Sequence, residues 1–73
     1  MKTIKEQLPL KNKPIKLHFG KEKIECIAFE GGSGVYSIET EDFDDNRYWC
    51  EGDETPGCSL EDIKDCKWEY VNK

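Results

Sequence analysis

The sequence predicts one small all-β domain, either a five-stranded barrel or a strongly bent antiparallel sheet, with one short helical turn before the last strand. Three observations support this prediction. Several short segments alternate apolar and polar residues with the period of two that is typical of half-buried strands. Segments rich in glycine, proline and aspartate separate them, as turns do. A chain of 73 residues has room for one hydrophobic core, to which eight aromatic side chains can contribute.

The first two strands are predicted over residues 15–19 and 24–30, with a turn at 20–23. In residues 15–19 (IKLHF) apolar and polar side chains alternate, which predicts one buried face. Residues 24–30 (IECIAFE) have apolar side chains on both faces. This pattern predicts a central or strongly bent strand that is covered on both sides.

The next two strands are predicted over residues 35–40 and 47–51. Glycine-rich residues 31–34 (GGSG) precede the first of them, and the pair 24–30 and 35–40 is typical of a hairpin with a glycine-rich loop. An acidic turn at residues 41–46 (EDFDDN) then leads to the short aromatic strand.

A helical turn and a fifth strand are predicted at the end of the chain. Residues 52–57 (GDETPG) have strong turn chemistry. Ser59, followed three residues later by Asp62, matches a capping box with aspartate in place of glutamate. Residues 66–71 alternate again and place Cys66, Trp68 and Tyr70 on one face.

This order of elements resembles that of a small SH3-like barrel. The resemblance covers residues 15–71, and its most telling feature is the helical turn SLEDI before the final strand. Barrels of this kind mostly bind peptides, nucleic acids or other proteins, so the resemblance implies a binding module. A small open sheet covered by an N-terminal arm is the alternative architecture.

The N-terminal residues 1–14 are predicted to form a lysine-rich arm over a single domain that spans residues 15–73. Seven lysines against two glutamates give residues 1–23 a charge of +5. Four basic and fourteen acidic side chains give residues 24–73 a charge of −10. No apolar segment follows Met1 as a signal peptide requires, and no segment is long enough to span a membrane, so the sequence predicts a cytoplasmic protein.

The candidate binding surface consists of acidic side chains around two adjacent aromatic residues. Alternation allows only one of the two rings to point outward, and that ring would be the apolar contact. The candidate residues are Glu39, Glu41, Asp42, Asp44, Asp45, Tyr48, Trp49, Glu51, Asp53 and Glu54. Such a surface would bind a protein with a basic surface, and it would repel the phosphates of nucleic acids.

The acidic turn also has oxygen ligands where a calcium loop has its first, third and fifth positions. Arg47, however, stands at the sixth position, where such a loop needs glycine, and Asp53 stands where it needs a bidentate glutamate. We therefore interpret the turn as a solvated acidic segment.

The four cysteines leave three alternatives open. Cys26, Cys50, Cys58 and Cys66 lack the close C-x2-C spacing of most zinc sites. They are predicted to be mainly buried free thiols; two disulfides, or a cysteine-bound zinc ion in a metal-stabilised domain, are the alternatives.

The function predicted from these features is a small acidic, non-enzymatic protein-interaction module without a cofactor. In size and charge it resembles accessory or inhibitor proteins of phages and mobile elements, which block basic sites on host proteins. A metal-stabilised structural domain and a small-ligand-binding oligomer with aromatic pockets are the alternative functions.

Overall fold

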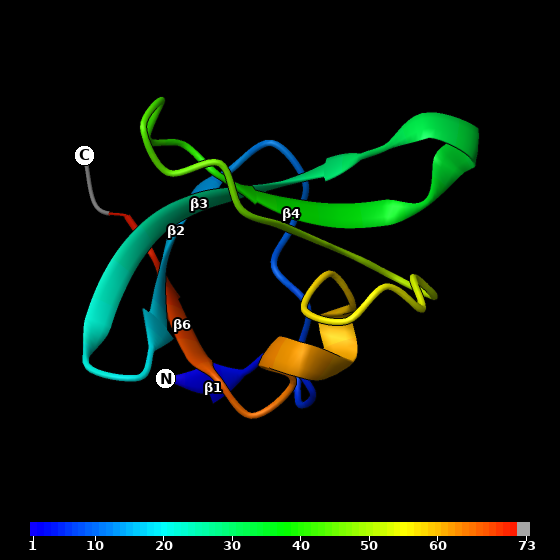
Figure 1. Cartoon of the computed structure of the whole chain (residues 1–73). Coiled ribbons are helices and arrows are strands. Elements are labelled where there is room, and N and C mark those ends of the chain that lie inside the picture. Colours follow the sequence, from blue (N-terminus) through cyan, green and yellow to red (C-terminus); the bar gives the residue numbers. More distant parts are fainter. Residues whose placement is uncertain (72–73) are drawn as a thin grey trace.

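The computed structural model describes residues 1–71, and its strands form one unclosed antiparallel sheet in the order β1-β6-β2-β3-β4-β5 (Figure 1). Helical structure in this part of the chain is confined to two 3-10 turns, η1 and η2. The elements are β1 (Lys2–Thr3), β2 (Pro14–Phe19), β3 (Glu22–Glu30), η1 (Gly32–Gly34), β4 (Tyr36–Thr40), β5 (Tyr48–Cys50), η2 (Leu60–Ile63) and β6 (Lys67–Tyr70). The predicted all-β class and the helical turn before the last strand are confirmed.

Strands β2 and β3 form the longest pairing of the sheet, with six residue pairs. Only Gly20 and Lys21 connect them, so the turn is shorter than the predicted residues 20–23. Gly20 has a φ of +62°, a left-handed value that costs most other residues about 1 to 2 kcal/mol. Glycine therefore favours the tight hairpin at this position.

Strand β3 lies in the middle of the sheet and pairs with β2 through its first part and with β4 through its second part. Its inner face presents Ile24, Cys26 and Ala28, all of which are buried. Ile27 and Phe29 on the opposite face are half-buried. The predicted apolar character of both faces thus corresponds to one fully buried and one partly covered face.

The hydrophobic core fills the concave side of the curved sheet. Buried side chains from the strands, the N-terminal segment and η2 meet there. Phe19 packs on Trp49 with ring centroids 5.9 Å apart. The buried members are Ile4, Ile15, Leu17, Ile24, Cys26, Ala28, Ile38, Trp49, Ile63 and Trp68.

The segment around η2 lies between the two edge strands of the sheet, β5 and β1 (Figure 1, orange). Next to β5, the Cys50 N–H donates to the Cys58 carbonyl at 2.8 Å. Next to β1, the Ile4 N–H donates to the Cys66 carbonyl at 3.0 Å. The segment therefore bridges the opening that the sheet itself leaves unclosed.

The predicted capping box at the start of η2 is confirmed. The Glu61 N–H donates to Ser59 Oγ at 3.2 Å, and the Ser59 N–H donates to Asp62 Oδ2 at 3.0 Å. Ile63 is fully buried and Leu60 is half-buried against the core. The cap thus fixes a turn whose apolar side chains cover the interior.

The N-terminal segment packs onto the sheet. It contributes the short strand β1, which the sequence analysis did not predict, and Ile4 is only 3% exposed. Tyr36 donates its hydroxyl to the Pro9 carbonyl at 2.5 Å, and Trp68 Nε1 donates to the Gln7 carbonyl at 2.9 Å. Two aromatic side chains of the sheet therefore hold this segment by its backbone.

Strand β6 differs in part from its predicted pattern. Trp68 is buried, but Cys66 precedes the strand and is half-buried, and Tyr70 is 41% exposed. The Tyr70 ring packs edge-on against Trp68 at 4.9 Å, and its hydroxyl accepts the Leu10 N–H at 3.1 Å. Tyr70 thus covers the end of the sheet instead of lying within the core.

Candidate interaction surface

The predicted acidic side chains divide into two groups at opposite ends of β5. One group lies on the acidic turn (residues 41–46), which joins β4 to β5 and projects beyond the sheet (Figure 1, yellow-green). The other lies on the loop at residues 51–57, which follows β5. Glu39 and Tyr48 are cross-strand partners between the two groups. In the first group Glu41, Asp42 and Asp44 are exposed and Asp45 is half-buried; in the second, Glu51 and Glu54 are exposed and Asp53 is half-buried.

Internal hydrogen bonds give the acidic turn a defined shape. Asp42 accepts the Asp44 N–H on its carboxylate at 2.9 Å and the Asp45 N–H on its carbonyl at 3.1 Å. The Thr40 hydroxyl donates to the Asp45 carbonyl. These contacts use the local side-chain bonding that makes aspartate common in turns.

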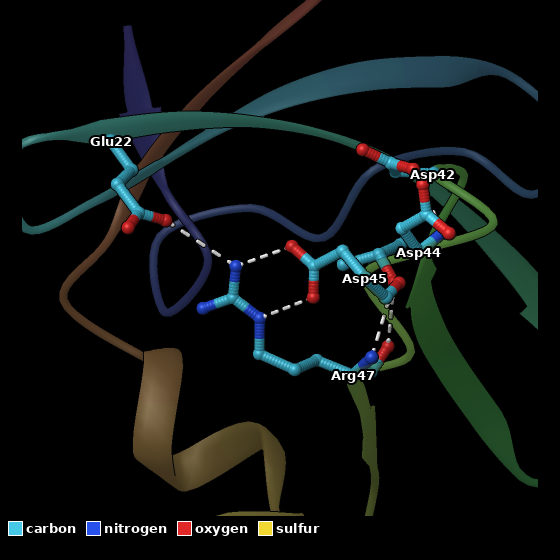
Figure 2. A network of polar contacts seen from close by, with 6 residues as sticks. Glu22, Asp42, Asp44, Asp45 and Arg47 are labelled. Atoms are coloured by element: carbon cyan, nitrogen blue, oxygen red, sulfur yellow. Dashed lines mark hydrogen bonds and ion pairs between the residues drawn. The ribbon is translucent and has the colours of Figure 1, made fainter.

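Arg47 holds two carboxylates that lie far apart in the sequence (Figure 2). Its Nε donates to Asp45 Oδ1 at 2.7 Å, a second nitrogen donates to Asp45 Oδ2, and the same nitrogen donates to Glu22 Oε2 at 3.3 Å. Its guanidinium carbon also lies 5.4 Å from the centroid of the Phe19 ring. Arg47 therefore ties the turn to the start of β3.

Hydrogen bonding to the Arg47 guanidinium lowers the pKa of the Asp45 carboxyl below its ordinary value of 3.8. The two hydrogen bonds form a bidentate pair, the strongest geometry for a carboxylate and an arginine. Asp45, which the sequence analysis placed in the binding surface, is thus engaged in holding the turn together.

Phe43 is the most exposed large apolar side chain in residues 1–71, at 98%. It was absent from the predicted binding residues, although it stands in the middle of the acidic turn. One signal in the sequence indicated that Phe43 is exposed. It is an isolated aromatic residue within a run of acidic residues, and such a run does not form a buried face. The orientation of a turn side chain follows no period, so the exposure became visible only in the structure.

An open hollow of about 670 Å³ lies between the acidic turn and the first half of β3. Ile24 contributes an apolar part of its wall, and Lys23 is its basic lining residue. The carboxylates that line it are Glu22, Glu25, Glu41, Asp42 and Asp45. Two of these carboxylates are paired with Arg47, and the others give the hollow an acidic character.

The two adjacent aromatic residues of β5 point to opposite faces, as alternation requires. Trp49 is 3% exposed and packs in the core, whereas Tyr48 is 47% exposed. The predicted binding surface is therefore corrected at Trp49, which is buried against Phe19 and lies out of reach of a partner. Tyr48 is the member of the pair that reaches the surface.

The loop after β5 has its own fixed contacts. Asp53 Oδ1 accepts the Thr55 N–H at 2.7 Å, and this hydrogen bond lowers the pKa of Asp53. The neighbouring Cys58 thiol, followed by the Asp53 carboxylate, raises the pKa of Tyr48 above its ordinary value of 10.0.

The four cysteines form no disulfide with one another in the structure. Cys26 lies in the core, where burial raises its pKa to about 12, whereas the other three are half-buried and not fully buried as predicted. Within residues 1–71, no three side chains of histidine, cysteine, aspartate or glutamate come together as metal ligands. The alternative of a zinc ion held by Cys26, Cys50, Cys58 and Cys66 thus finds no assembled ligand set in this part of the chain.

No protein-family model, curated protein or solved structure matches the chain. In the described part of the chain, no helix has the length and apolar character needed to cross a membrane.

Proposed function

We propose that this protein is a small acidic, non-enzymatic interaction module that binds a basic surface on another protein. The observation that carries the proposal is the projecting acidic turn, on which Glu41, Asp42 and Asp44 are exposed and Phe43 is 98% exposed. Interfaces of this kind combine charge complementarity with a buried aromatic contact.

The distribution of ion pairs supports a partner of opposite charge. Within residues 1–71, Arg47 pairs with Asp45 and Glu22, whereas Glu41, Asp42 and Asp44 are in no ion pair. Exposed like charges on one turn repel each other, and cations on a partner relieve this repulsion. The same carboxylates would repel a phosphate backbone, so the proposed partner is a protein and not a nucleic acid.

The proposed architecture is an SH3-like barrel, in which binding modules are common. In the order β6-β2-β3-β4-β5, the last strand of the chain pairs with β2. This pairing places β6 and β5 on opposite sides of the central strands, as in a sheet that curls towards a barrel. The helical turn η2 immediately precedes β6, as in the resembling folds. A similar order of elements supports a fold but does not identify a partner, so the partner is inferred from the surface residues.

The test is selection of binders from a random 12-residue peptide library displayed on phage, with the full chain immobilised at 50 mM NaCl. We expect the selected peptides to be enriched in lysine and arginine compared with the unselected library. Their affinity should fall about tenfold between 50 and 300 mM NaCl, since salt screens exposed charges.

Three double variants locate the binding surface, because each removes two negative charges. D42N/D44N changes the acidic turn, E51Q/E54Q changes the loop, and E61Q/D65N is the control on the segment around η2. We expect D42N/D44N to weaken peptide binding several-fold more than the control. Selected peptides without basic enrichment, or equal effects of D42N/D44N and the control, would overturn the proposal.

A further inference from the structure

We propose that Phe43 is a preformed anchor for an apolar pocket rimmed by lysine or arginine on a partner protein. This inference rests on the proposed function and specifies the partner's surface. Its starting point is the 98% exposure of Phe43, which is far above that of a residue that stabilises the fold by burial. A large apolar group in full contact with water gains from burial only when another molecule covers it.

The turn that bears Phe43 is fixed on both sides of the ring. The residues that flank Phe43 in the chain are bonded to each other: the Asp44 N–H donates to Asp42 Oδ1 at 2.9 Å. Arg47 and the Thr40 hydroxyl hold Asp45 at the far end of the turn. A partner therefore meets a turn whose backbone is already ordered, which lowers the entropic cost of binding.

The surroundings of the ring identify the chemistry of the pocket. Exposed carboxylates precede and follow Phe43 in the chain, at Glu41, Asp42 and Asp44. A pocket lined only by apolar groups would leave these charges facing an apolar rim, whereas lysine or arginine around the rim would pair with them. An aromatic centre within a polar rim is the usual anatomy of a binding hot spot.

The shape of the site requires a concave partner. The acidic turn projects beyond the sheet (Figure 1). Phe43 is 98% exposed on this turn, so a partner has to surround the ring in order to bury it. The partner surface is accordingly a cavity of about one aromatic ring with cations at its edge, which distinguishes it from a flat basic surface such as a nucleic-acid-binding face.

The experiment selects binders on the wild-type chain from a displayed library of a small folded scaffold with a randomised concave face, and measures them individually against F43S. The matched control is L10S, because Leu10 is also an exposed apolar residue, at 58%, and lies outside the acidic turn. We expect the randomised faces of the selected binders to combine lysine or arginine with leucine, isoleucine or aromatic residues. F43S should weaken their binding about 10- to 30-fold, the range of a hot-spot residue, while L10S and F43L change it less.

The outcomes separate this inference from the proposed function. Scaffold binders that bind F43S as tightly as the wild type would overturn the anchor role and leave the acidic surface in place. Peptides without basic enrichment would overturn both. Analytical ultracentrifugation measures the oligomeric state of wild type and F43S. A wild-type dimer that F43S converts to a monomer would place Phe43 against a second copy of this chain. That result would overturn the proposed external partner. Equal stability of wild type and F43S in urea shows that lost binding is not lost folding.

Discussion

Arg47 is the side chain that divides the carboxylates of the acidic turn into structural and available ones. Its bidentate contact takes up Asp45, and its second contact reaches Glu22 on β3. Glu41 and Asp42 stay on the surface beside it. Exposed single ion pairs such as Arg47–Glu22 contribute little to stability, but a bidentate arginine–carboxylate pair such as Arg47–Asp45 is more favourable.

The lowered pKa of Asp45 predicts a pH-dependent contribution to stability. Because Arg47 depresses the native pKa, the contribution is present above the ordinary value of 3.8 and is lost as the pH falls through the lowered value. We expect D45N to lower the free energy of unfolding at pH 7. The difference between D45N and wild type should become smaller as the pH is lowered below 3.8, as measured by urea denaturation at pH 7 and at a series of acidic pH values.

D44N is the matched control for this prediction, because it removes the same charge from the same turn without touching the arginine pair. It should show a smaller difference from wild type at pH 7. If D45N and D44N had equal effects at pH 7, the arginine pair would contribute nothing specific, and the assignment of Asp45 as a structural residue would be wrong.

Single residues differ in how well the sequence predicts their place. Tyr48 and Trp49 had to face opposite ways, and the hydrophobic pattern around them identified a strand with one buried face. The pairing of Arg47 with Glu22 joins residues 25 positions apart, so only the folded sheet reveals it. Phe43 lies in a turn, where no period indicates which side chains point outward.

At the level of elements, η2 combines a local cap with long-range packing. Ser59 accepts the Glu61 N–H, and Asp62 accepts the Ser59 N–H, so two amides of the first turn have partners. We predict that S59A lowers the free energy of unfolding by about 1 kcal/mol, the usual effect of removing a capping hydroxyl. Urea denaturation followed by tryptophan fluorescence measures this difference.

D62A and D65A complete this comparison. Asp62 accepts the second hydrogen bond of the cap, whereas Asp65 is exposed beyond η2; both substitutions remove one negative charge, and D62A also removes the acceptor. We expect D62A to be destabilising and D65A to be nearly neutral. Similar effects of the two would mean that charge, and not the cap, accounts for the change.

The strands with clear alternation were predictable, and β1 was not. A two-residue strand has no period of its own, and Lys2 and Thr3 are strand residues only because they pair with β6 at the other end of the chain. The cap at Ser59 could be recognised because its hydrogen bonds lie within four residues. The prediction thus succeeded where structure is local and failed where pairing partners are distant.

For the whole molecule, the N-terminal segment is predicted to be part of the cooperative fold. Ile4 is 3% exposed among the core residues, and β1 pairs with β6. We expect I4A to lower the free energy of unfolding by about 2 to 5 kcal/mol, a large share of the stability of a domain this small. Thermal unfolding followed by circular dichroism provides the measurement.

L10A is the control for this prediction, since Leu10 belongs to the same segment but is 58% exposed. It should change stability by less than about 0.5 kcal/mol, as surface substitutions usually do. A small effect of I4A, equal to that of L10A, would show that the segment lies on the sheet without contributing to its core.

The short outer strands of the unclosed sheet also limit how another chain can attach. At β5, the Cys58 carbonyl already takes the Cys50 N–H, and the outer strand at the other side, β1, is two residues long and contains Lys2. A partner peptide thus finds little free backbone to extend the sheet by strand addition. If the protein binds a partner as proposed, recognition would depend on side chains, so affinity should follow the partner's residue types and not its tendency to form a β-strand. Because little strand edge is unpaired, we also expect concentrated solutions of the protein to resist aggregation through edge-to-edge strand pairing.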